Sequence, residues 1–279
     1  MLVIQNSSGQ LGNKLLITSH VIAYCLSSDE ILINFILLDD AKYFSPHGFF
    51  KKKILLPRSK ILQKSFNFFL EVVNKITMVC YKSQFYDKQQ VGWIHTEIRS
   101  IKRRTNTILL LEGEGFRGTV DVNLHYKSLK NIFRLKKKYQ KQVSQQLEKY
   151  QDADFLLIGI HIRRGDYRNW AGGVYFYKDY VYKEAIEQFN NLPSLKNKKK
   201  KFILFSDELI EKENFKNYKT IISSNTMIVD LYLLAECNYI IGPPSTFSGW
   251  ASFFGNVPLY VLESEKFVMT LDQFKIFQL

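Results

Sequence analysis

The sequence is poor in cysteine and histidine, and each shortage excludes a class of protein. Only three cysteines, Cys25, Cys80 and Cys237, occur among 279 residues, at wide spacings and with no Cys-x-x-Cys pair. This spacing argues against a disulfide-rich secreted scaffold and predicts reduced thiols in the core, as is typical of a cytoplasmic protein. The five histidines show no metal-ligand spacing, so we expect no structural zinc site.

Long apolar runs are missing as well. The longest, Ile31 to Leu38, contains Asn34 and is far too short to span a bilayer. The amino-terminal Met-Leu-Val-Ile-Gln-Asn has no basic segment or cleavage site of a signal peptide, and it predicts a first strand instead. We therefore expect an intracellular protein that is either soluble or peripheral to a membrane.

Acidic residues are outnumbered, with 26 Asp and Glu against 39 Lys and Arg, for a formal net charge of +13. Such an excess suits an anionic partner: nucleic acid, an acidic membrane surface or a phosphorylated substrate. Each basic run by itself is interpreted as a solvated face, and together they favour a weak membrane contact. No nucleic-acid motif is interleaved with them, so nucleic acid is not an expected partner. The runs are Lys51–Lys53, Lys102–Arg104, Lys136–Lys138 and Lys198–Lys201.

Short apolar runs alternate with helical patterns along most of the chain, which predicts an α/β fold with mostly parallel sheets. The apolar content of 46% supports a substantial core, and the length is comfortable for two small domains. We expect an amino-terminal half over residues 1–150 and a carboxyl-terminal half over 151–279. The predicted strands are 2–5, 31–37, 107–111, 155–162, 202–205, 239–242 and 259–262. The predicted helices are 14–26, 65–78, 124–150, 179–189, 230–237 and one that follows the turn at 243–248 and is closed by Gly255.

The stretch from Phe155 to Tyr167 carries the strongest signal, because a buried strand stops there at a cluster of charge. In open α/β sheets, ligands bind at the carboxyl ends of the strands. Extended geometry would place His161 and Arg163 on one face and Arg164 on the other. One guanidinium is then expected to hold a diphosphate in fork geometry, while its neighbour pairs with Asp166. Structural salt bridges for both arginines are the alternative.

Four further loops follow predicted strands. The loop containing Gly9 and Gly12 can present backbone N–H groups to a phosphate, although it is not a full Gly-x-Gly-x-x-Gly. Glu112 and Glu114, bracketed by glycines, are candidates for a general base, with a solvent-exposed turn as the alternative. Asp207 can accept the paired N–H donors of guanine or cap a helix. The turn at 243–248 offers the hydroxyls of Ser245, Thr246 and Ser248, and capping would explain one of them.

Three segments resemble one family. His161-Ile-Arg-Arg-Gly-Asp166 resembles the first signature motif, His-x-Arg-Arg-x-Asp, of the α-1,2-fucosyltransferases that use GDP-fucose. Gly9-Gln-Leu-Gly-Asn13 is similar to their amino-terminal Gly-Gly-Leu-Gly-Asn-Gln, with Gln10 and Lys14 in place of a glycine and a glutamine. Asp230 to Cys237 followed by Ser-Thr-Phe-Ser-Gly-Trp250 resembles the third motif, with Gly249 where a second Trp is common.

This resemblance implies a GT-B-like fold of two Rossmann-like halves and an inverting transfer of L-fucose from GDP-fucose to a galactoside. It implies an α-1,2 linkage on a surface glycan or oligosaccharide, with no metal and no cofactor besides the donor substrate. A bacterial, cytoplasmic enzyme at the inner face of the membrane would follow. The alternatives are another GDP-sugar or linkage on the same scaffold, and a non-enzymatic basic protein that binds polyanions.

The chemistry of such a transfer assigns roles to individual residues. We expect Arg163, with Arg164 as second candidate, to stabilise the negative charge of the departing GDP, and Asp166 or Glu114 to be the base if the reaction needs one. Ser245, Thr246 and the loop at Gly12 and Asn13 would assist at the phosphates. The donor-binding residues we expect are Gly9, Gln10, Gly12, Asn13, His161, Arg163, Arg164, Asp207, Ser245, Thr246 and Phe247.

Overall fold

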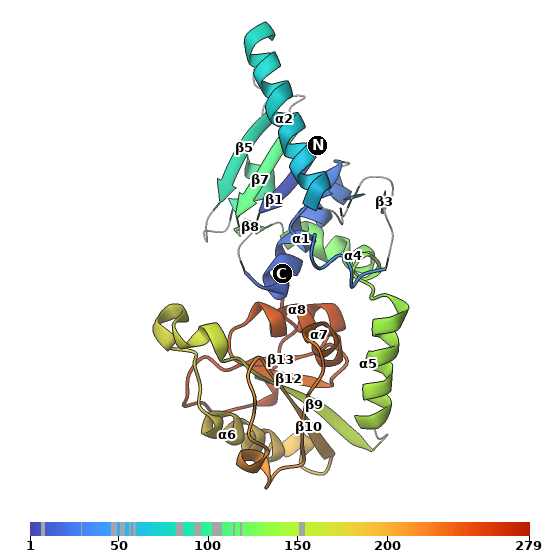
Figure 1. Ribbon diagram of the computed structural model, residues 1–279. Coiled ribbons are helices and arrows are strands. Elements are labelled where there is room, and N and C mark those ends of the chain that lie inside the picture. The colour runs from blue at the N-terminus through green and yellow to red at the C-terminus, as the bar shows by residue number, and fades with distance from the viewer. Residues whose placement is uncertain are drawn as a thin grey trace. The chain divides into compact units, whose positions relative to one another are not determined.

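The chain folds into two compact α/β units, shown in Figure 1. The computed structural model describes residues 1–6, 9–28, 30–45, 49–50, 54–55, 57, 60–81, 86–91, 96–101, 108–113, 115–117, 119–150 and 154–279. Unit 1 comprises Met1–Lys137 together with Leu279, and unit 2 comprises Lys138–Gln278. Helix α5, Lys137–Tyr150, which the sequence analysis assigned to the first half, starts at this division and continues in unit 2.

Unit 1 is built on a six-stranded sheet of order β3-β4-β2-β1-β7-β5, parallel except for the pair β3 and β4. Its centre is β1, whose Leu2, Val3 and Ile4 are fully buried. The strands are β1 Leu2–Asn6, β2 Leu32–Asn34, β3 Phe49–Phe50, β4 Ile54–Leu55, β5 Tyr86–Val91 and β7 Ile108–Gly113, and β6 Thr96–Glu97 pairs separately with β8 Phe116–Arg117.

The second predicted strand is shorter in the structure than the sequence suggested. It ends at Asn34, because the buried Asn34 side chain accepts a hydrogen bond from the Ile36 backbone N–H at 2.9 Å and turns the chain. The same amide donates to the Thr18 hydroxyl at 2.9 Å, which anchors the turn to helix α1, Leu11–Ser28. The helices of unit 1 are α1 Leu11–Ser28, α2 Lys60–Tyr81, α3 Thr119–Leu124 and α4 Tyr126–Ile132, with a 3₁₀ turn at Ile98–Ser100.

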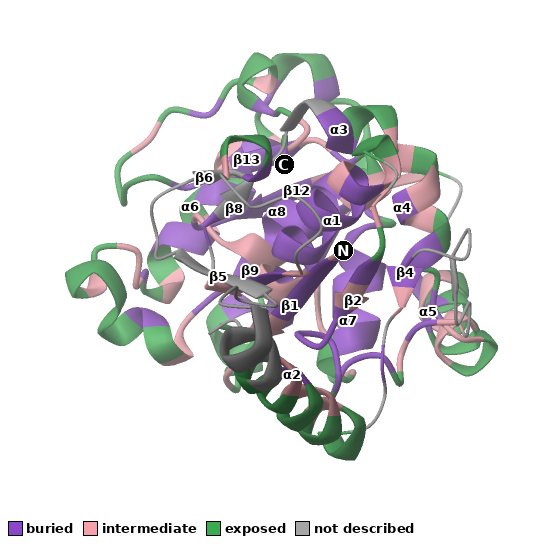
Figure 2. Cartoon of the chain, turned by 90° about the horizontal axis from the view of Figure 1, so that it is seen from above, coloured by how far each residue is buried: buried purple, intermediate pink, exposed green. Residues whose placement is uncertain are grey.

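Unit 2 is built on a five-stranded parallel sheet of order β11-β10-β9-β12-β13, with β9 at its centre. Figure 2 shows the central strand β9 and its neighbour β12 as mostly buried. The strands are β9 Phe155–Ile162, β10 Lys199–Ser206, β11 Thr220–Ile222, β12 Tyr239–Gly242 and β13 Leu259–Val261. Besides α5, the helices are α6 Asp179–Asn190, α7 Met227–Leu234 and α8 Thr246–Gly255.

The side chains of β9 alternate between two helical layers. Ile158, Ile160 and Ile162 belong to the core cluster that contains the buried face of α6. Gly159 faces the opposite layer, where a Cβ atom would lie 2.3 Å from Cδ1 of Leu234 on α7. A side chain at this position would therefore separate α7 from the sheet. Short 3₁₀ segments complete the unit, at Gly165–Arg168, Trp170–Gly173, Pro193–Leu195, Lys212–Phe215 and Leu271–Gln273.

Two predictions about residue types have different outcomes. Cys25 and Cys237 are buried thiols, as expected, while the side chain of Cys80 lies outside the described residues. The interpretation of Lys198–Lys201 as a solvated face is wrong for Lys200, since β10 begins at Lys199 and buries the next side chain. Lys200 is only 8% exposed, and its ammonium group donates to the Leu195 carbonyl at 2.6 Å and to the Asn190 carbonyl at 3.3 Å. Within the part of the chain that the structure describes, no helix has the length and apolarity needed to cross a membrane.

Candidate functional site

His161, the penultimate residue of β9, is buried and faces the first turn of α8. Its ring packs on Phe247, with the ring centroids 5.0 Å apart and the planes tilted by 31°. Burial, reinforced by the charge of Arg163, lowers the pKa of His161 to about 3. Among the described residues, Nδ1 has no hydrogen-bond partner. The imidazole is therefore neutral at ordinary pH and contributes an aromatic, uncharged wall beside Arg163.

Arg163 lies just beyond β9 and is 9% exposed. Its Nη1 donates to Oδ2 of Asp207 at 2.6 Å, and its Nη2 lies 2.5 Å from Oδ1 of Asp166. Its guanidinium carbon is 5.5 Å from the centre of the Tyr167 ring. The contacts with Asp207, Asp166 and the Tyr167 ring thus hold the guanidinium of Arg163 in one orientation. One of the two arginines was predicted to pair with Asp166, and in the structure that arginine is Arg163, because the turn after it brings Asp166 back onto its guanidinium.

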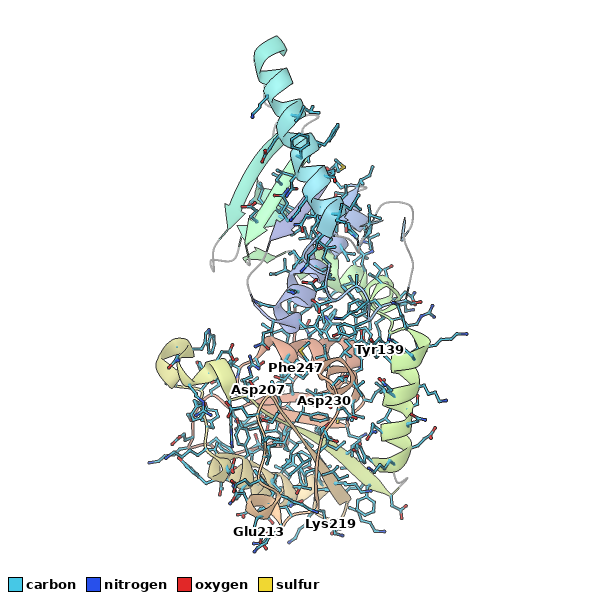
Figure 3. The ribbon with its side chains drawn as sticks, viewed as in Figure 1. Tyr139, Asp207, Glu213, Lys219, Asp230 and Phe247 are labelled. Carbon is cyan, nitrogen blue, oxygen red and sulfur yellow. The ribbon has the colours of Figure 1, made fainter. Side chains whose placement is uncertain are left out.

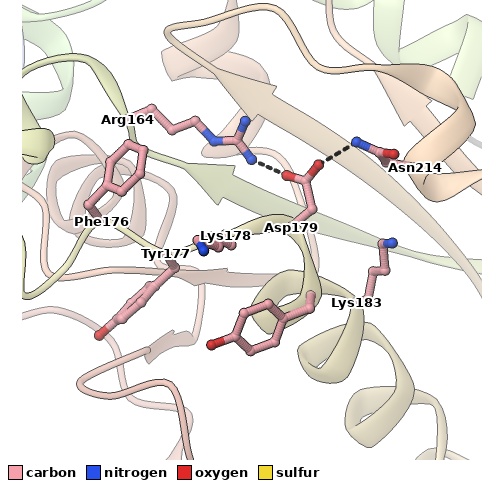
Figure 4. A pocket seen from close by; sticks show the side chains of 8 residues that line it. Arg164, Phe176, Tyr177, Lys178, Asp179, Lys183 and Asn214 are labelled. Carbon is pink, nitrogen blue, oxygen red and sulfur yellow. Dashed lines mark hydrogen bonds and ion pairs between the residues drawn. The ribbon is translucent and has the colours of Figure 1, made fainter.

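Arg164 points to the opposite face, as the strand alternation predicted. Its guanidinium forms an ion pair with Asp179 at the start of α6, and the other oxygen of Asp179 accepts a hydrogen bond from Asn214 at 2.7 Å. These residues line a pocket of about 350 Å³ (Figure 4). The contacts of Arg164 thus agree with the alternative of a structural salt bridge. The role of Arg164 in donor binding stays a prediction. The pocket is lined by Arg164, Phe176, Tyr177, Lys178, Asp179, Tyr180, Lys183 and Asn214.

Asp207 follows β10 and ties the two arginines together. Oδ2 accepts from the Arg163 guanidinium, and Oδ1 accepts from the Arg164 backbone N–H at 2.9 Å. The close approach requires a glycine at 165, since a Cβ atom there would lie 2.7 Å from Oδ2 of Asp207. Figure 3 labels Asp207 and Phe247 at the same end of the unit 2 sheet. The guanine contact predicted for Asp207 stays a prediction, and its carboxylate is already occupied by the arginine segment.

The turn before α8 joins the same end of the sheet. Ser245 is the N-cap of α8, and its hydroxyl accepts a hydrogen bond from the Phe247 backbone N–H at 3.2 Å. The Ser248 hydroxyl donates to the Ser245 carbonyl at 3.3 Å. The Tyr167 hydroxyl donates to the Pro244 carbonyl, and burial raises the pKa of this tyrosine. Unit 2 thus brings His161, Arg163, Asp166, Asp207 and the turn at 245–247 to one end of its sheet, while the guanidinium of Arg164 lies on the other face.

The predicted residues of the amino-terminal loop form a separate group within unit 1. Gly9 has φ of +98°, and a Cβ atom there would also lie 2.7 Å from the Asn13 amide nitrogen. Gln10 is exposed, whereas Gly12 is buried within the first turn of α1. Lys14, which stands where the family resemblance has a glutamine, forms an ion pair with Asp40 at 3.1 Å. The requirement for a glycine at position 9 therefore has a steric cause in this loop.

Of the two glutamates proposed as bases, the structure describes only Glu112. The strand expected to end at Leu111 continues as β7 to Gly113, and Glu112 is half-buried within it. In the sheet register, Glu112 is opposite Asn6 and Gln90, so it lies in regular structure and not in a loop. Glu114 lies outside the described residues. Among the described side chains, no cluster of three or more His, Cys, Asp and Glu residues has the geometry of a metal site.

Sequence reasoning missed an aromatic stack beside Arg163. The Trp170 ring is stacked on Tyr167 with centroids 4.8 Å apart, and Tyr175 lies 5.6 Å away on a tilted plane. Trp170 remains 42% exposed. The chain turns sharply behind it, with φ of +50° at Ala171 and +70° at Gly172. The two adjacent glycines signalled the turn, but the stacking depends on Tyr167, which the 3₁₀ turn at Gly165–Arg168 brings onto the same side.

Comparisons with known proteins agree with this geometry. The model of the family described as Glycosyl transferase family 11 matches residues 119–266. An alpha-1,2-colitosyltransferase of Escherichia coli is 23% identical over 287 residues, covering 92% of this chain and 89% of the relative.

Two solved structures show the same fold. FUT1 of Arabidopsis thaliana, a mutant in complex with GDP, is 16% identical with a TM-score of 0.62, covering 97% of this chain and 72% of that one. Fucosyltransferase NodZ from Bradyrhizobium is 15% identical with a TM-score of 0.59, covering 94% of each chain. The predicted GT-B-like architecture with two Rossmann-like halves is confirmed by the two mostly parallel sheets and by these neighbours.

Proposed function

Because the chain belongs to glycosyl transferase family 11, we propose that it transfers L-fucose from GDP-fucose to a galactoside hydroxyl, forming an α-1,2 linkage with inversion. The observation that carries the proposal is Arg163, a guanidinium buried at the carboxyl end of the central strand and oriented by two carboxylates. Further support comes from NodZ, an α-1,6-fucosyltransferase of the same fold whose crystal was soaked with GDP-fucose, and from FUT1, which was crystallised with GDP. The Escherichia coli relative carries the same alpha-1,2 linkage in its name.

In this reaction the bond between the fucosyl C1 and the β-phosphate oxygen breaks, and negative charge develops on GDP. A fixed guanidinium stabilises that charge without having to reorganise. Asp207 stays paired with Arg163 when the donor binds, because the Asp207 side chain is only 24% exposed and also accepts a hydrogen bond from the Arg164 backbone N–H. Asp166, at 55% exposure, is the partner that the diphosphate replaces on Nη2. The N-terminus of the ten-residue helix α8, with Ser245 and Thr246, supplies further N–H and hydroxyl donors.

The acceptor hydroxyl forms the new bond to C1 and must lose its proton. Asp166, once released from Arg163 by the diphosphate, is a carboxylate at the edge of this site and can take that proton. Glu114 remains the other candidate. A rate that becomes independent of pH when Asp166 is changed to Asn would support Asp166. An unchanged acidic limb in that variant would reject it.

The donor sugar has a second candidate, since the Escherichia coli relative is a colitosyltransferase. The same pyrophosphate site would serve any GDP-linked sugar, because Arg163 and the start of α8 contact no sugar hydroxyl in this scheme. Hydrolysis rates measured with GDP-fucose, GDP-colitose and GDP-mannose separate the candidates. Faster hydrolysis of GDP-fucose supports fucose as the donor sugar. Faster hydrolysis of GDP-colitose would make colitose the donor sugar, and the roles proposed for the residues would stay the same.

The role of Arg163 is tested with Arg163→Lys and Arg163→Ala. Lysine keeps the positive charge but lacks the paired N–H donors of the guanidinium. We expect kcat to fall by about 10²- to 10³-fold in both variants, the range for the loss of a preorganised hydrogen-bond donor. The control is Arg168→Ala, which removes an exposed guanidinium that pairs with Glu208. Far-UV circular dichroism checks that each variant folds. A turnover near that of the parent protein in Arg163→Lys and Arg163→Ala would reject the assignment.

We further propose that the acceptor is a galactose-containing surface glycan, and that transfer at the inner face of the membrane needs neither metal nor cofactor. A guanidinium fixed by two carboxylates supplies the positive charge that a divalent cation provides in other transferases. Dialysis of the enzyme against EDTA should therefore leave the transfer rate unchanged. A rate that is lost with EDTA and restored by Mg²⁺ or Mn²⁺ would contradict this.

A further inference from the structure

Helix α2 is fixed to the sheet of unit 1 by one of its faces. Leu70 is fully buried, and Phe66 packs beside it against the core cluster around Val3 and Leu110. On the same side, Gln63 donates to the backbone carbonyl of Gln5 at 3.2 Å, and Asn67 accepts a hydrogen bond from the Gln5 amide at 2.7 Å. These contacts set the rotation of the helix about its axis, so its remaining faces are determined as well.

A second apolar face lies on the outer side of α2. Ile61 is 77% exposed, Phe68 69%, Phe69 55% and Val72 39%. Relative to Ile61 these residues stand at i+7, i+8 and i+11, which places them on one stripe of a helix, on the other side from Leu70. Figure 2 shows this outer side of α2 as exposed. A single exposed apolar side chain is ordinary, but a stripe of four with two phenylalanines marks an interaction surface.

The charge next to this stripe is positive. Lys60, Lys64 and Lys75 are exposed on α2, against one exposed carboxylate, Glu71. Lys60 pairs with Asp39, but both side chains are more than 60% exposed, at 69% and 64%, so that pair is weak and solvated. The whole chain has a formal net charge of +13. An apolar stripe bordered by lysines is the pattern of helices that lie in the interface of an anionic bilayer.

We propose that the outer face of α2 binds an anionic membrane surface, with Phe68 and Phe69 at the boundary of headgroups and acyl chains and the lysines at the phosphates. The helix lies along the surface, in keeping with its alternation of apolar and charged residues. A second copy of the chain is the less favoured occupant, because a two-fold contact would set the same lysines against each other. The surface is distinct from the residues proposed for catalysis and does not depend on them.

The test is sedimentation of the full-length chain with vesicles of phosphatidylcholine alone and of phosphatidylcholine mixed with phosphatidylglycerol. We expect binding to the anionic vesicles only. The double variant Phe68→Gln with Phe69→Gln should lose about tenfold or more of its partitioning, since two aromatic side chains no longer enter the interface. Lys64→Gln and Lys75→Gln should each lose about fivefold. Glutamine is a good helix former, so α2 is preserved.

The matched controls are Leu124→Gln, at 74% exposure, and Leu209→Gln, at 97%, which remove exposed apolar side chains elsewhere. Both should bind vesicles like the parent protein, and all variants should keep their activity on a soluble acceptor. Equal binding by the parent and the Phe68/Phe69 variant would overturn the proposal. So would a dimer in analytical ultracentrifugation that dissociates only in that variant, because the face would then be a contact between copies. A failure of the fucosyl-transfer proposal leaves the vesicle result unaffected.

Discussion

A neutral histidine beside a charged arginine is the most unusual single-residue feature of this site. Burial and the charge of Arg163 both disfavour an imidazolium at position 161 and lower the pKa of His161 to about 3. In the folded protein the His161 imidazole therefore stays unprotonated at pH values below about 6.5, at which the same imidazole is protonated in the unfolded chain. The contribution to stability is fully present above that pH and is lost progressively as the pH falls towards 3.

The first prediction is a difference in acid sensitivity between the parent protein and His161→Phe. Between pH 7.5 and pH 5 the titration of this one group should remove about 2 kcal/mol from the free energy of unfolding of the parent. Phenylalanine keeps the aromatic contact with Phe247 but does not titrate, so the variant should lack this component. Urea unfolding at several pH values measures the difference. Parallel curves for the two proteins would show that His161 is not held neutral.

Asp207 is expected to act through Arg163, as a positioning residue. Asp207→Asn keeps the size but loses the charge that orients the guanidinium, and we expect kcat to fall roughly 10- to 100-fold with little change in KM for the donor. Glu208→Gln, which disturbs only the exposed pair with Arg168, is the control. Combined with Arg163→Lys, the losses should be less than additive. Additive losses with a raised KM would instead favour the predicted guanine contact.

At the scale of elements, α8 packs against its neighbours through two glycines. A Cβ atom on Gly255 would lie 2.0 Å from the backbone carbonyl oxygen of Ala235, just after α7. At Gly249 the nearest atoms belong to the Phe277 ring, at 3.1 Å and beyond. This ring occupies the space beside the position where the family resemblance implied a second Trp. The Phe277 ring can shift to make room for a methyl group, whereas the Ala235 backbone cannot. A substitution by alanine should therefore be tolerated better at position 249 than at position 255.

Gly255→Ala should therefore destabilise the protein by about 1–3 kcal/mol, whereas Gly249→Ala should cost less than about 1 kcal/mol because Phe277 can shift. Urea midpoints of both variants measure this. Equal losses at the two positions would mean that the α7 and α8 packing is looser than described here.

The predicted elements agree with the structure best where a contiguous apolar run has clear ends. The strands at 155–162 and 239–242 coincide with β9 and β12 for that reason. Lys199–Lys201 were mispredicted because their strand structure comes from pairing with Phe155–Leu157 of β9, which composition does not reveal. The ion pair of Arg164 with Asp179 was missed likewise, since Asp179 reaches Arg164 and Asn214 only after α6 packs on the sheet.

At the scale of the whole molecule, the choice of nucleotide separates the enzyme from a basic polyanion-binding protein. GDP at about 100 times its dissociation constant should stabilise the full-length chain by about 2.7 kcal/mol. UDP and CMP should shift the melting temperature much less, and a differential scanning fluorimetry series compares the three. Salt-sensitive binding to nucleic acid without any response to GDP would contradict the transferase assignment.

The alternation of β9 has one more consequence, for changes in the length of the chain. His161 packs on Phe247 of α8 and Arg163 pairs with Asp207, while Arg164 turns to Asp179 of α6, and the parity of the positions along the strand decides which guanidinium lies on which face. Inserting or deleting one residue between Gly159 and Arg163 would swap the two arginines between the layers while leaving the composition of the motif intact. Natural or engineered relatives should therefore carry no insertion or deletion of an odd number of residues between these positions, and a scan of such insertions and deletions with an activity assay tests this.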